Sequence, residues 1–241
     1  MDYGKRLEIL KSEKRNNVIP MYRAIEWFYS KYPYKIKSMR EIGYLTEEDR
    51  NLQNTGADTE IIFEDGLKQY WERKLSDQAR SKEFDLGKKA ICIAEYNKNG
   101  FGVSWGEYTK ASDFICFGRH VYDSPETILY IFERESFFKK FWEIYNSINS
   151  TITISKDLLD YMIRNGIKRI ENSGYIKGLI DKISVNSYHK GHEGFCCNIY
   201  MEEWYRRCVE EWGILAGKFT TDKLVKEPDK PYISGTYISG E

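Results

Sequence analysis

A predicted β-hairpin between Gly56 and Ser76 constrains the fold of this chain more than any other stretch. Residues 59–64 alternate polar and apolar side chains, as a half-buried strand does. Asp65-Gly66 follows as a dipeptide that tolerates positive φ, and residues 69–76 resume the extended pattern. Two neighbouring antiparallel strands are therefore expected in the folded chain.

This hairpin is expected to gather three charged side chains. Alternate residues of a strand point to the same face, so Glu72 and Lys74 share one face of the second strand. Asp58, at the start of the first strand, can reach across the hairpin to meet Glu72. Carboxylates are hard oxygen ligands of the kind that Mg²⁺ prefers, with water and a substrate phosphate filling its other positions. A lysine beside them can stabilise the negative charge that develops on a phosphoryl group.

The alternative is that these residues form an exposed strand face. Glu72 and Lys74 would then make a same-face ion pair that adds little to stability. Glu60 shares the face of Asp58, and it is either a substitute ligand or a solvated strand residue. We favour the solvated interpretation for Glu60.

Composition narrows the class of protein. The 241 residues are 41% hydrophobic, enough for one large domain or a domain with an elaboration. No run of eighteen apolar residues exists and the charged N-terminus lacks an apolar region, so we expect no membrane span, no secretory signal and a cytoplasmic location. Basic and acidic side chains both number 37, which argues against unselective coating of nucleic acid. Five cysteines without a C-x-x-C motif predict reduced thiols and no disulfide-linked partner.

Helix and strand patterns alternate along the rest of the chain, which predicts a mixed α/β fold. Residues 1–150 are expected to form the core domain, and residues 151–241 a helical elaboration packed on it, with an extended tail from about residue 222. Apart from the hairpin, helices are predicted over residues 20–32, 77–89, 136–148, 157–170 and 198–212, and strands over residues 34–44, 90–95, 114–117 and 127–132.

The ordered acids and lysine resemble the motif of the PD-(D/E)XK nuclease superfamily, which includes many restriction endonucleases and phage nucleases. By that resemblance Asp58 is the first acid of the motif, and Glu72 and Lys74 form its E-x-K. Ala57 stands where the motif has proline. The resemblance implies a restriction-endonuclease-like αβββαβ core with a mixed central sheet.

A second stretch resembles phage-type members of the same superfamily. It consists of residues 86–96, ending in an acid-containing strand, and residues 109–117, in which Asp113 precedes another strand. The resemblance implies that Glu95 lies near the site as an additional metal or water ligand. A helix before the hairpin often supplies one more acid in these proteins. Glu26 is the candidate here, with Glu47 and Glu48 as rivals.

The resemblance implies a Mg²⁺-dependent endonuclease that hydrolyses DNA, in which Mn²⁺ can substitute and which acts in a host cell as part of a phage or mobile element. Asp58 and Glu72 would bind the metal, and Lys74 would assist the attacking water. Residues 151–241 would add substrate selectivity or a homodimer surface, because cutting both strands usually recruits two sites. The alternative is a catalytically silent nucleic-acid-binding or structural module on the same fold.

Two further clusters have weaker patterns. His189 and His192 precede Cys196-Cys197, and these are zinc ligand types, but adjacent cysteines seldom both reach one metal. Arg206-Arg207 lies beside Trp204 and Tyr205 and could contact a nucleic acid. Aromatic stripes at helical spacing usually pack inside, so we interpret the arginines as solvated.

Overall fold

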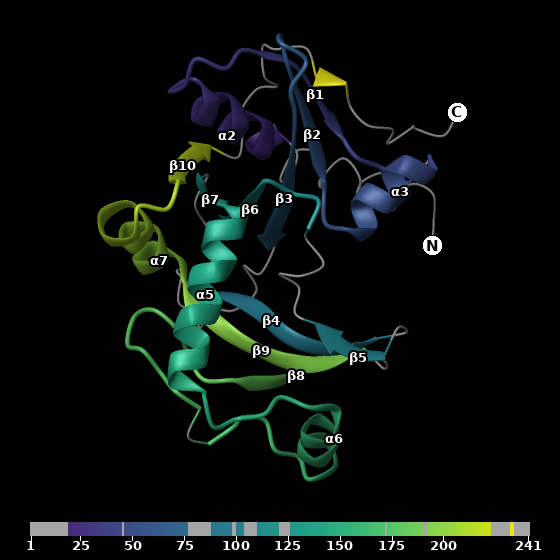
Figure 1. Ribbon diagram of the computed structural model, residues 1–241, viewed down its shortest axis with the longest axis vertical. Helices are drawn as coiled ribbons and strands as arrows, with labels where there is room; N and C mark the ends of the chain where they lie inside the picture. Colours follow the sequence, from purple (N-terminus) through teal and green to yellow (C-terminus); the bar gives the residue numbers. More distant parts are fainter. Residues whose placement is uncertain are drawn as a thin grey trace. The chain divides into compact units, whose positions relative to one another are not determined.

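The chain folds into two compact units that interleave along the sequence (Figure 1). The computed structural model describes residues 19–44, 46–76, 88–97, 100–103, 110–120, 126–171, 173–189, 192–222 and 232–233. One unit takes residues 1–83, 111–134 and 216–241, and the other takes residues 84–110 and 135–215. This corrects the predicted division at residue 150, because segments from both sides of that position build each unit.

The first unit is built on a seven-stranded mixed sheet, in the order β10-β7-β6-β3-β2-β1-β11. Two neighbouring pairs in it are parallel, β3 with β6 and β1 with β11, and the other pairs are antiparallel. The predicted α/β class with a mixed sheet is therefore confirmed. Its elements are α2 (Ile19–Tyr29), β1 (Ile36–Glu41), α3 (Glu47–Asn54), β2 (Thr59–Phe63), β3 (Lys68–Ser76), β6 (Phe114–His120), β7 (Glu126–Glu133), β10 (Ala216–Asp222) and β11 (Tyr232–Ile233).

The predicted hairpin is confirmed as β2 and β3. Thr59 lies opposite Trp71, and the register continues through Ile61 and its partner Gln69. At the turn, Gly66 adopts a φ of 88°, a conformation that side chains with a Cβ rarely adopt. The Asp65 carboxylate accepts a hydrogen bond from the backbone N–H two residues later, which fixes the turn.

Helix α2 covers one face of the first sheet and fixes which face of β3 is the core. The rings of Phe28 and Trp71 lie 5.6 Å apart edge to face, and Trp71 stacks on Phe114 of β6 at 5.0 Å. Trp71 is fully buried. Because strand side chains alternate, Tyr70 and Glu72 on either side of Trp71 point to the opposite face of the sheet.

The described residues of the second unit form a four-stranded antiparallel sheet, in the order β5-β4-β9-β8, and four helices. Phe137 and Phe141 of α5 pack on Trp204 of α7, with ring centroids 5.1 and 6.1 Å apart. The aromatic face predicted for residues 136–148 is therefore core. Its elements are β4 (Lys88–Asn97), β5 (Gly100–Val103), α5 (Arg134–Ile148), α6 (Lys156–Arg164), β8 (Ser184–His189), β9 (His192–Tyr200), α7 (Met201–Arg207) and the π-helix η2 (Cys208–Trp212).

The prediction that residues 151–241 form a helical elaboration is wrong. Strands β8 and β9 form a hairpin, and β9 also pairs with β4. Strand β10 pairs with β7, so this part of the chain completes the first sheet. Apolar residues spaced for a helix from residue 198 misled the prediction, because the residues up to Tyr200 are held in the strand ladder and α7 begins only at Met201.

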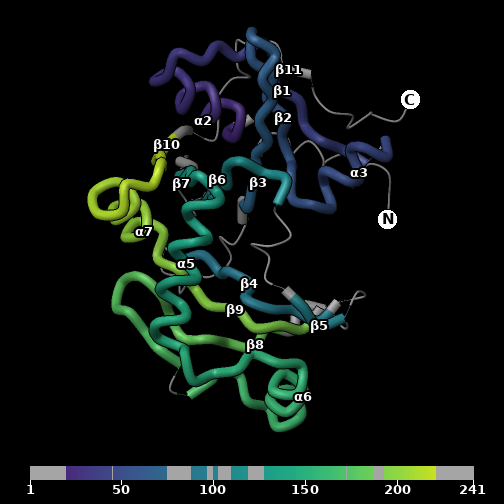
Figure 2. Tube along the Cα trace, viewed as in Figure 1, coloured from purple at the N-terminus to yellow at the C-terminus, as the bar shows by residue number. Residues whose placement is uncertain are grey.

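Two further predictions fall partly or wholly outside the described residues. The helix expected over residues 77–89 lies there, apart from its last two residues, which begin β4. Of the tail from about residue 222, the structure describes β11, which pairs parallel with β1 through Met39 and Tyr232. Figure 2 follows the Cα trace of β1, β2 and β3, which are neighbours in the first sheet. Within the described parts of the chain, no helix has the length and apolar character needed to cross a membrane.

Candidate active site on β3

The structure brings Asp58 and Glu72 together on the face of the sheet that α2 does not cover. Asp58 directly precedes β2, and its backbone N–H donates to the carbonyl of Trp71, the register partner of Thr59, at 2.9 Å. The two carboxyls lie close enough to hydrogen-bond to each other. Two adjoining strands therefore hold two acids in one small volume, as the hairpin pattern predicts.

Glu72 is a buried acid with an unusual proton affinity. It is only 3% exposed, and its pKa is raised from 4.5 to about 7. Burial is the first cause and the negative charge of Asp58 adds to it, whereas the ammonium of Lys74 opposes the rise. Near neutral pH the pair therefore holds a proton for part of the time, and a bound cation would displace that proton.

Lys74 makes an ion pair with Glu72 from the same face of β3. The Glu72 side chain is 4% exposed and the Lys74 side chain 39% exposed, so the ammonium lies between the buried acid and the solvent. A cation in this position can meet the charge of an incoming anionic substrate. The shared face predicted for the E-x-K residues is confirmed, and their catalytic roles stay predictions.

Two donors that the sequence pattern does not indicate hold Asp58. The backbone N–H of Arg73 donates to Asp58 Oδ2 at 2.9 Å, and Gln53 Nε2 of α3 donates to Asp58 Oδ1 at 3.3 Å. Gln53 Nε2 also donates to the carbonyl of Ile42 at 2.6 Å, while Gln53 Oε1 accepts from the Tyr44 hydroxyl at 3.4 Å. These contacts fix which end of the amide faces Asp58.

Helix α3 positions Gln53 because its start is well defined. The Thr46 side chain accepts a hydrogen bond from the backbone N–H of Asp49 at 3.0 Å, as an N-cap residue does. Glu47 and Glu48 lie in the first turn, where negative charge complements the helix dipole, and both are exposed. No described contact connects either glutamate with the Asp58–Glu72 pair.

A second buried acid, Glu60 of β2, lies opposite Tyr70 and shares the Glu72 face of the hairpin. It is 2% exposed, which contradicts our interpretation of Glu60 as a solvated residue. Arg40 of β1 and Lys68 of β3 both pair with its carboxylate, the latter at 2.8 Å, and Arg40 also pairs with Asp49 at 2.7 Å. Burial alone would raise the pKa of Glu60, but hydrogen bonds from Lys68 and Arg40 outweigh burial and lower it.

Two other predicted acids, Glu26 and Glu95, are carried by other elements. Glu26 is on α2, which packs on the Trp71 face, so the sheet separates it from Glu72. It pairs with Arg23 at 3.4 Å and lines a cavity of about 220 Å³. Glu95 is on β4 in the second unit, and β4 pairs with β5 and β9. Strand β3 pairs with β2 and β6, so β4 does not bring Glu95 to the site as a sheet neighbour of β3, and the role of Glu95 stays a prediction.

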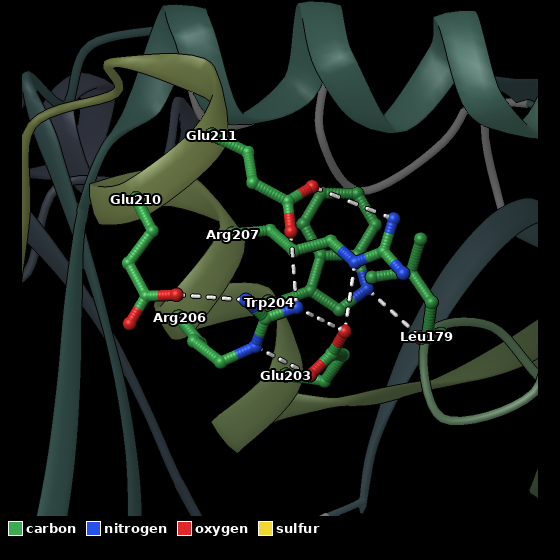
Figure 3. Close-up of polar contacts among 7 residues, drawn as sticks. All are labelled: Leu179, Glu203, Trp204, Arg206, Arg207, Glu210 and Glu211. Atoms are coloured by element: carbon green, nitrogen blue, oxygen red, sulfur yellow. Dashed lines mark hydrogen bonds and ion pairs between the residues drawn. The ribbon is translucent and has the colours of Figure 1, made fainter.

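Arg206 and Arg207 of α7 form ion pairs with neighbouring acids (Figure 3). Arg206 pairs with Glu203 at 2.9 Å and with Glu210 at 2.7 Å, and Arg207 pairs with Glu203 at 2.7 Å. Trp204 is fully buried and its indole N–H donates to the carbonyl of Leu179 at 2.8 Å. This network explains the arginines without a nucleic acid, although they are ion-paired rather than simply solvated.

The described residues contain no group of three or more histidine, cysteine or acidic side chains arranged to hold a metal ion. Asp58 and Glu72 form a group of two, and Mg²⁺ commonly takes only one or two carboxylates from a protein. The side chains of His189 and His192, named in the zinc alternative, lie outside the described residues.

Comparisons with protein-family models, with curated proteins and with solved structures find no match to this chain. The chemistry of the site therefore has to be inferred from its own side chains.

Proposed function

We propose that this protein is a Mg²⁺-dependent nuclease that hydrolyses phosphodiester bonds in DNA. The observation that carries the proposal is the meeting of Asp58, Glu72 and Lys74 on one face of the hairpin, with a Glu72 pKa raised to about 7. Glu72 is buried beside a second acid, and strongly shifted acids are concentrated at functional sites.

The order of elements in the first unit supports a restriction-endonuclease-like core. Helix α2 is followed by the antiparallel strands β1 to β3, with helix α3 inserted between β1 and β2, and then by β6, which lies parallel to β3. Apart from α3, this order matches the αβββ part and the last strand of the αβββαβ core that the sequence resemblance implies. The described part of the segment between β3 and β6 contributes β4 and β5, so the second core helix has no counterpart among the described residues.

The acid pair fits a divalent metal by its donor chemistry. Asp58 and Glu72 would hold the ion through carboxylate oxygens, and Glu72 would give up its proton when the ion binds. Bound Mg²⁺ would supply a water of lowered pKa and neutralise charge on the phosphoryl oxygens.

The remaining residues would orient the acids and stabilise charge. Gln53 and the Arg73 backbone hold Asp58 in a fixed direction. The Lys74 ammonium would orient the attacking water or stabilise negative charge as it develops on the phosphoryl group. It is therefore the third member of the proposed catalytic set.

The test is cleavage by the purified full chain of supercoiled plasmid, branched DNA and RNA, each in Mg²⁺, in Mn²⁺ and in a chelator. We expect metal-dependent cleavage of at least one DNA substrate, and its loss in Asp58→Asn and in Lys74→Met. Both changes preserve side-chain size while removing a charge.

A matched control is Lys68→Met, which removes a neighbouring lysine that pairs with Glu60 rather than with Glu72. This variant should retain cleavage. Cleavage that persists in both Asp58→Asn and Lys74→Met would contradict the proposal. No cleavage of any DNA by the unaltered protein would instead favour the catalytically silent module.

A further inference from the structure

The second unit holds two thiols directly opposite each other on neighbouring strands. Cys92 of β4 and Cys196 of β9 are register partners in the antiparallel pair. Directly opposed residues share a face, and their Cα atoms lie about 4.5 or about 5.5 Å apart, depending on the type of pair. Both values fall within the Cα separation of about 4.4–6.8 Å that a disulfide requires.

The remaining cysteines lack this geometry. Cys197 follows Cys196 in the strand and so points to the other face of the sheet, where it is buried and lies near Tyr145 of α5. Cys208 is buried in η2, which follows α7, and Cys116 is buried on β6 of the first sheet. Cys92 therefore has one natural partner among the four other cysteines.

The two thiols differ in access, which sets an order of reaction. Cys92 is half-buried and Cys196 is 4% exposed, so a small reagent reaches Cys92 first. The Cys92 thiol is already within hydrogen-bonding distance of Cys196, and it also donates to the Glu95 carboxylate at 3.8 Å.

We propose that Cys92 and Cys196 are a redox-active pair that closes to a disulfide linking β4 to β9, with a small-molecule disulfide as the oxidant. The Cys92 thiolate attacks one sulfur of the oxidant, which forms a mixed disulfide and releases one thiol. The Cys196 thiolate then attacks the Cys92 sulfur and releases the second thiol. The two protein protons leave on the two released thiols, and the two electrons lost by the cysteines reduce the oxidant.

The surroundings of Cys92 make this exchange slow at neutral pH. Its pKa is raised, first by the hydrogen bond to Cys196, then by burial, with the negative charge of Glu95 adding to the effect. Because the thiolate is the nucleophile, the reaction should speed up as pH rises above neutral. The experiment is therefore run at mildly alkaline pH.

The test incubates the full chain with oxidised glutathione, followed by alkylation of free thiols and peptide mapping by mass spectrometry. We expect one intramolecular link, Cys92–Cys196, that dithiothreitol reverses. In Cys196→Ser the reaction should stop at the mixed disulfide, with one glutathione on Cys92. In Cys92→Ser, Cys196 should stay unmodified. Cys208→Ser is the matched control and should still form the link.

A thermal measurement gives a second readout. The closed loop spans about 100 residues, so the oxidised protein should unfold on the order of 10 °C higher than the reduced protein, and Cys92→Ser should show no difference. A link from Cys92 to Cys197, or unmodified thiols after prolonged exposure to oxidised glutathione, would overturn the proposal.

Discussion

The pKa values of two buried glutamates on the same hairpin are shifted in opposite directions. Glu60 on β2 is 2% exposed and Glu72 on β3 is 3% exposed, so burial penalises both charged forms. The pKa of Glu60 is nevertheless lowered, whereas the pKa of Glu72 is raised to about 7. The difference lies in their partners, since Glu60 meets two cations and Glu72 meets one cation and another acid.

This comparison separates a structural acid from a candidate functional one. The Glu60 charge is compensated within the protein, so the fold loses an ion-pair network if that charge is removed. The Glu72 charge is only partly compensated within the protein. It therefore adds little to the stability of the fold, but it would attract a bound cation strongly. Changing each glutamate to glutamine should therefore affect different properties of the protein.

The largest expected effect is the loss of cleavage activity in the Glu72→Gln variant. Removing one of two metal-binding carboxylates should lower Mg²⁺-dependent cleavage by about 10³-fold or more, on the scale of losing a main electrostatic group in an active site. Glu60→Gln should stay within about tenfold of the unaltered protein. The measurement is the initial rate on a DNA substrate that the protein cuts, at saturating Mg²⁺.

The same pair of variants can contradict the comparison. Equal losses of activity in Glu72→Gln and Glu60→Gln, with both proteins folded by circular dichroism, would mean that the two acids are not distinguished by function. Full activity in Glu72→Gln would remove Glu72 from the site.

The next effect is on the pH dependence of stability without metal. Because the Glu72 pKa rises from 4.5 to about 7 on folding, the folded state binds more protons between these values and stability falls as pH rises through that range. At about 1.4 kcal/mol per pKa unit, the contribution of Glu72 reaches at most about 3 kcal/mol. It is measured as the pH-dependent difference in free energy of unfolding between the unaltered protein and Glu72→Gln.

Mg²⁺ gives this prediction an independent control. Metal binding favours the ionised carboxyl, so saturating Mg²⁺ should reduce the loss of stability between pH 5 and 7, and a chelator should restore it. An unfolding free energy difference that stays constant with pH would contradict the raised pKa of Glu72.

A smaller effect is expected on stability in Glu60→Gln. Removing one partner of a buried ion pair costs about 3–5 kcal/mol, but the Arg40 and Lys68 side chains are 25% and 49% exposed and can turn toward water. We therefore expect a loss of about 2 kcal/mol in urea unfolding at pH 8, where Glu72→Gln should be neutral or stabilising. The opposite ranking would show that Glu72 is the structural acid.

How much of this site could be predicted depends on how local each contact is. The two-residue period of β3 and the Asp-Gly turn suffice to bring Asp58, Glu72 and Lys74 together. The charge compensation of Glu60 was missed because Arg40 comes from β1, twenty residues away, although Lys68 was a detectable partner across the hairpin. Strand register makes such diagonal neighbours readable from a sequence.

Which of the two sheets each strand joins could not be predicted from the sequence, for a different reason. The apolar stretches of β4 and β6 look alike, and which sheet each one joins depends on pairing with β9 and β3 far along the chain. Glu95 was assigned to the site by a resemblance, which implied that the strand after β3 in the sequence carries a further acid of the site. Periodicity reports which face of a strand is buried, but it does not report the neighbouring strand.

The smallest expected effect tests a residue that orients the site without entering it. Gln53 donates to both Asp58 Oδ1 and the Ile42 carbonyl, so Gln53→Ala should let the Asp58 carboxylate turn and should weaken Mg²⁺ binding by about tenfold. Gln53→Glu should weaken it more, because the new oxygen would face the carboxylate and the carbonyl instead of donating to them. Asn54→Ala, an exposed neighbour on α3, is the matched control. Mg²⁺ titration followed by thermal unfolding measures the affinity apart from cleavage, and unchanged affinity in Gln53→Glu would show that Asp58 needs no such orientation.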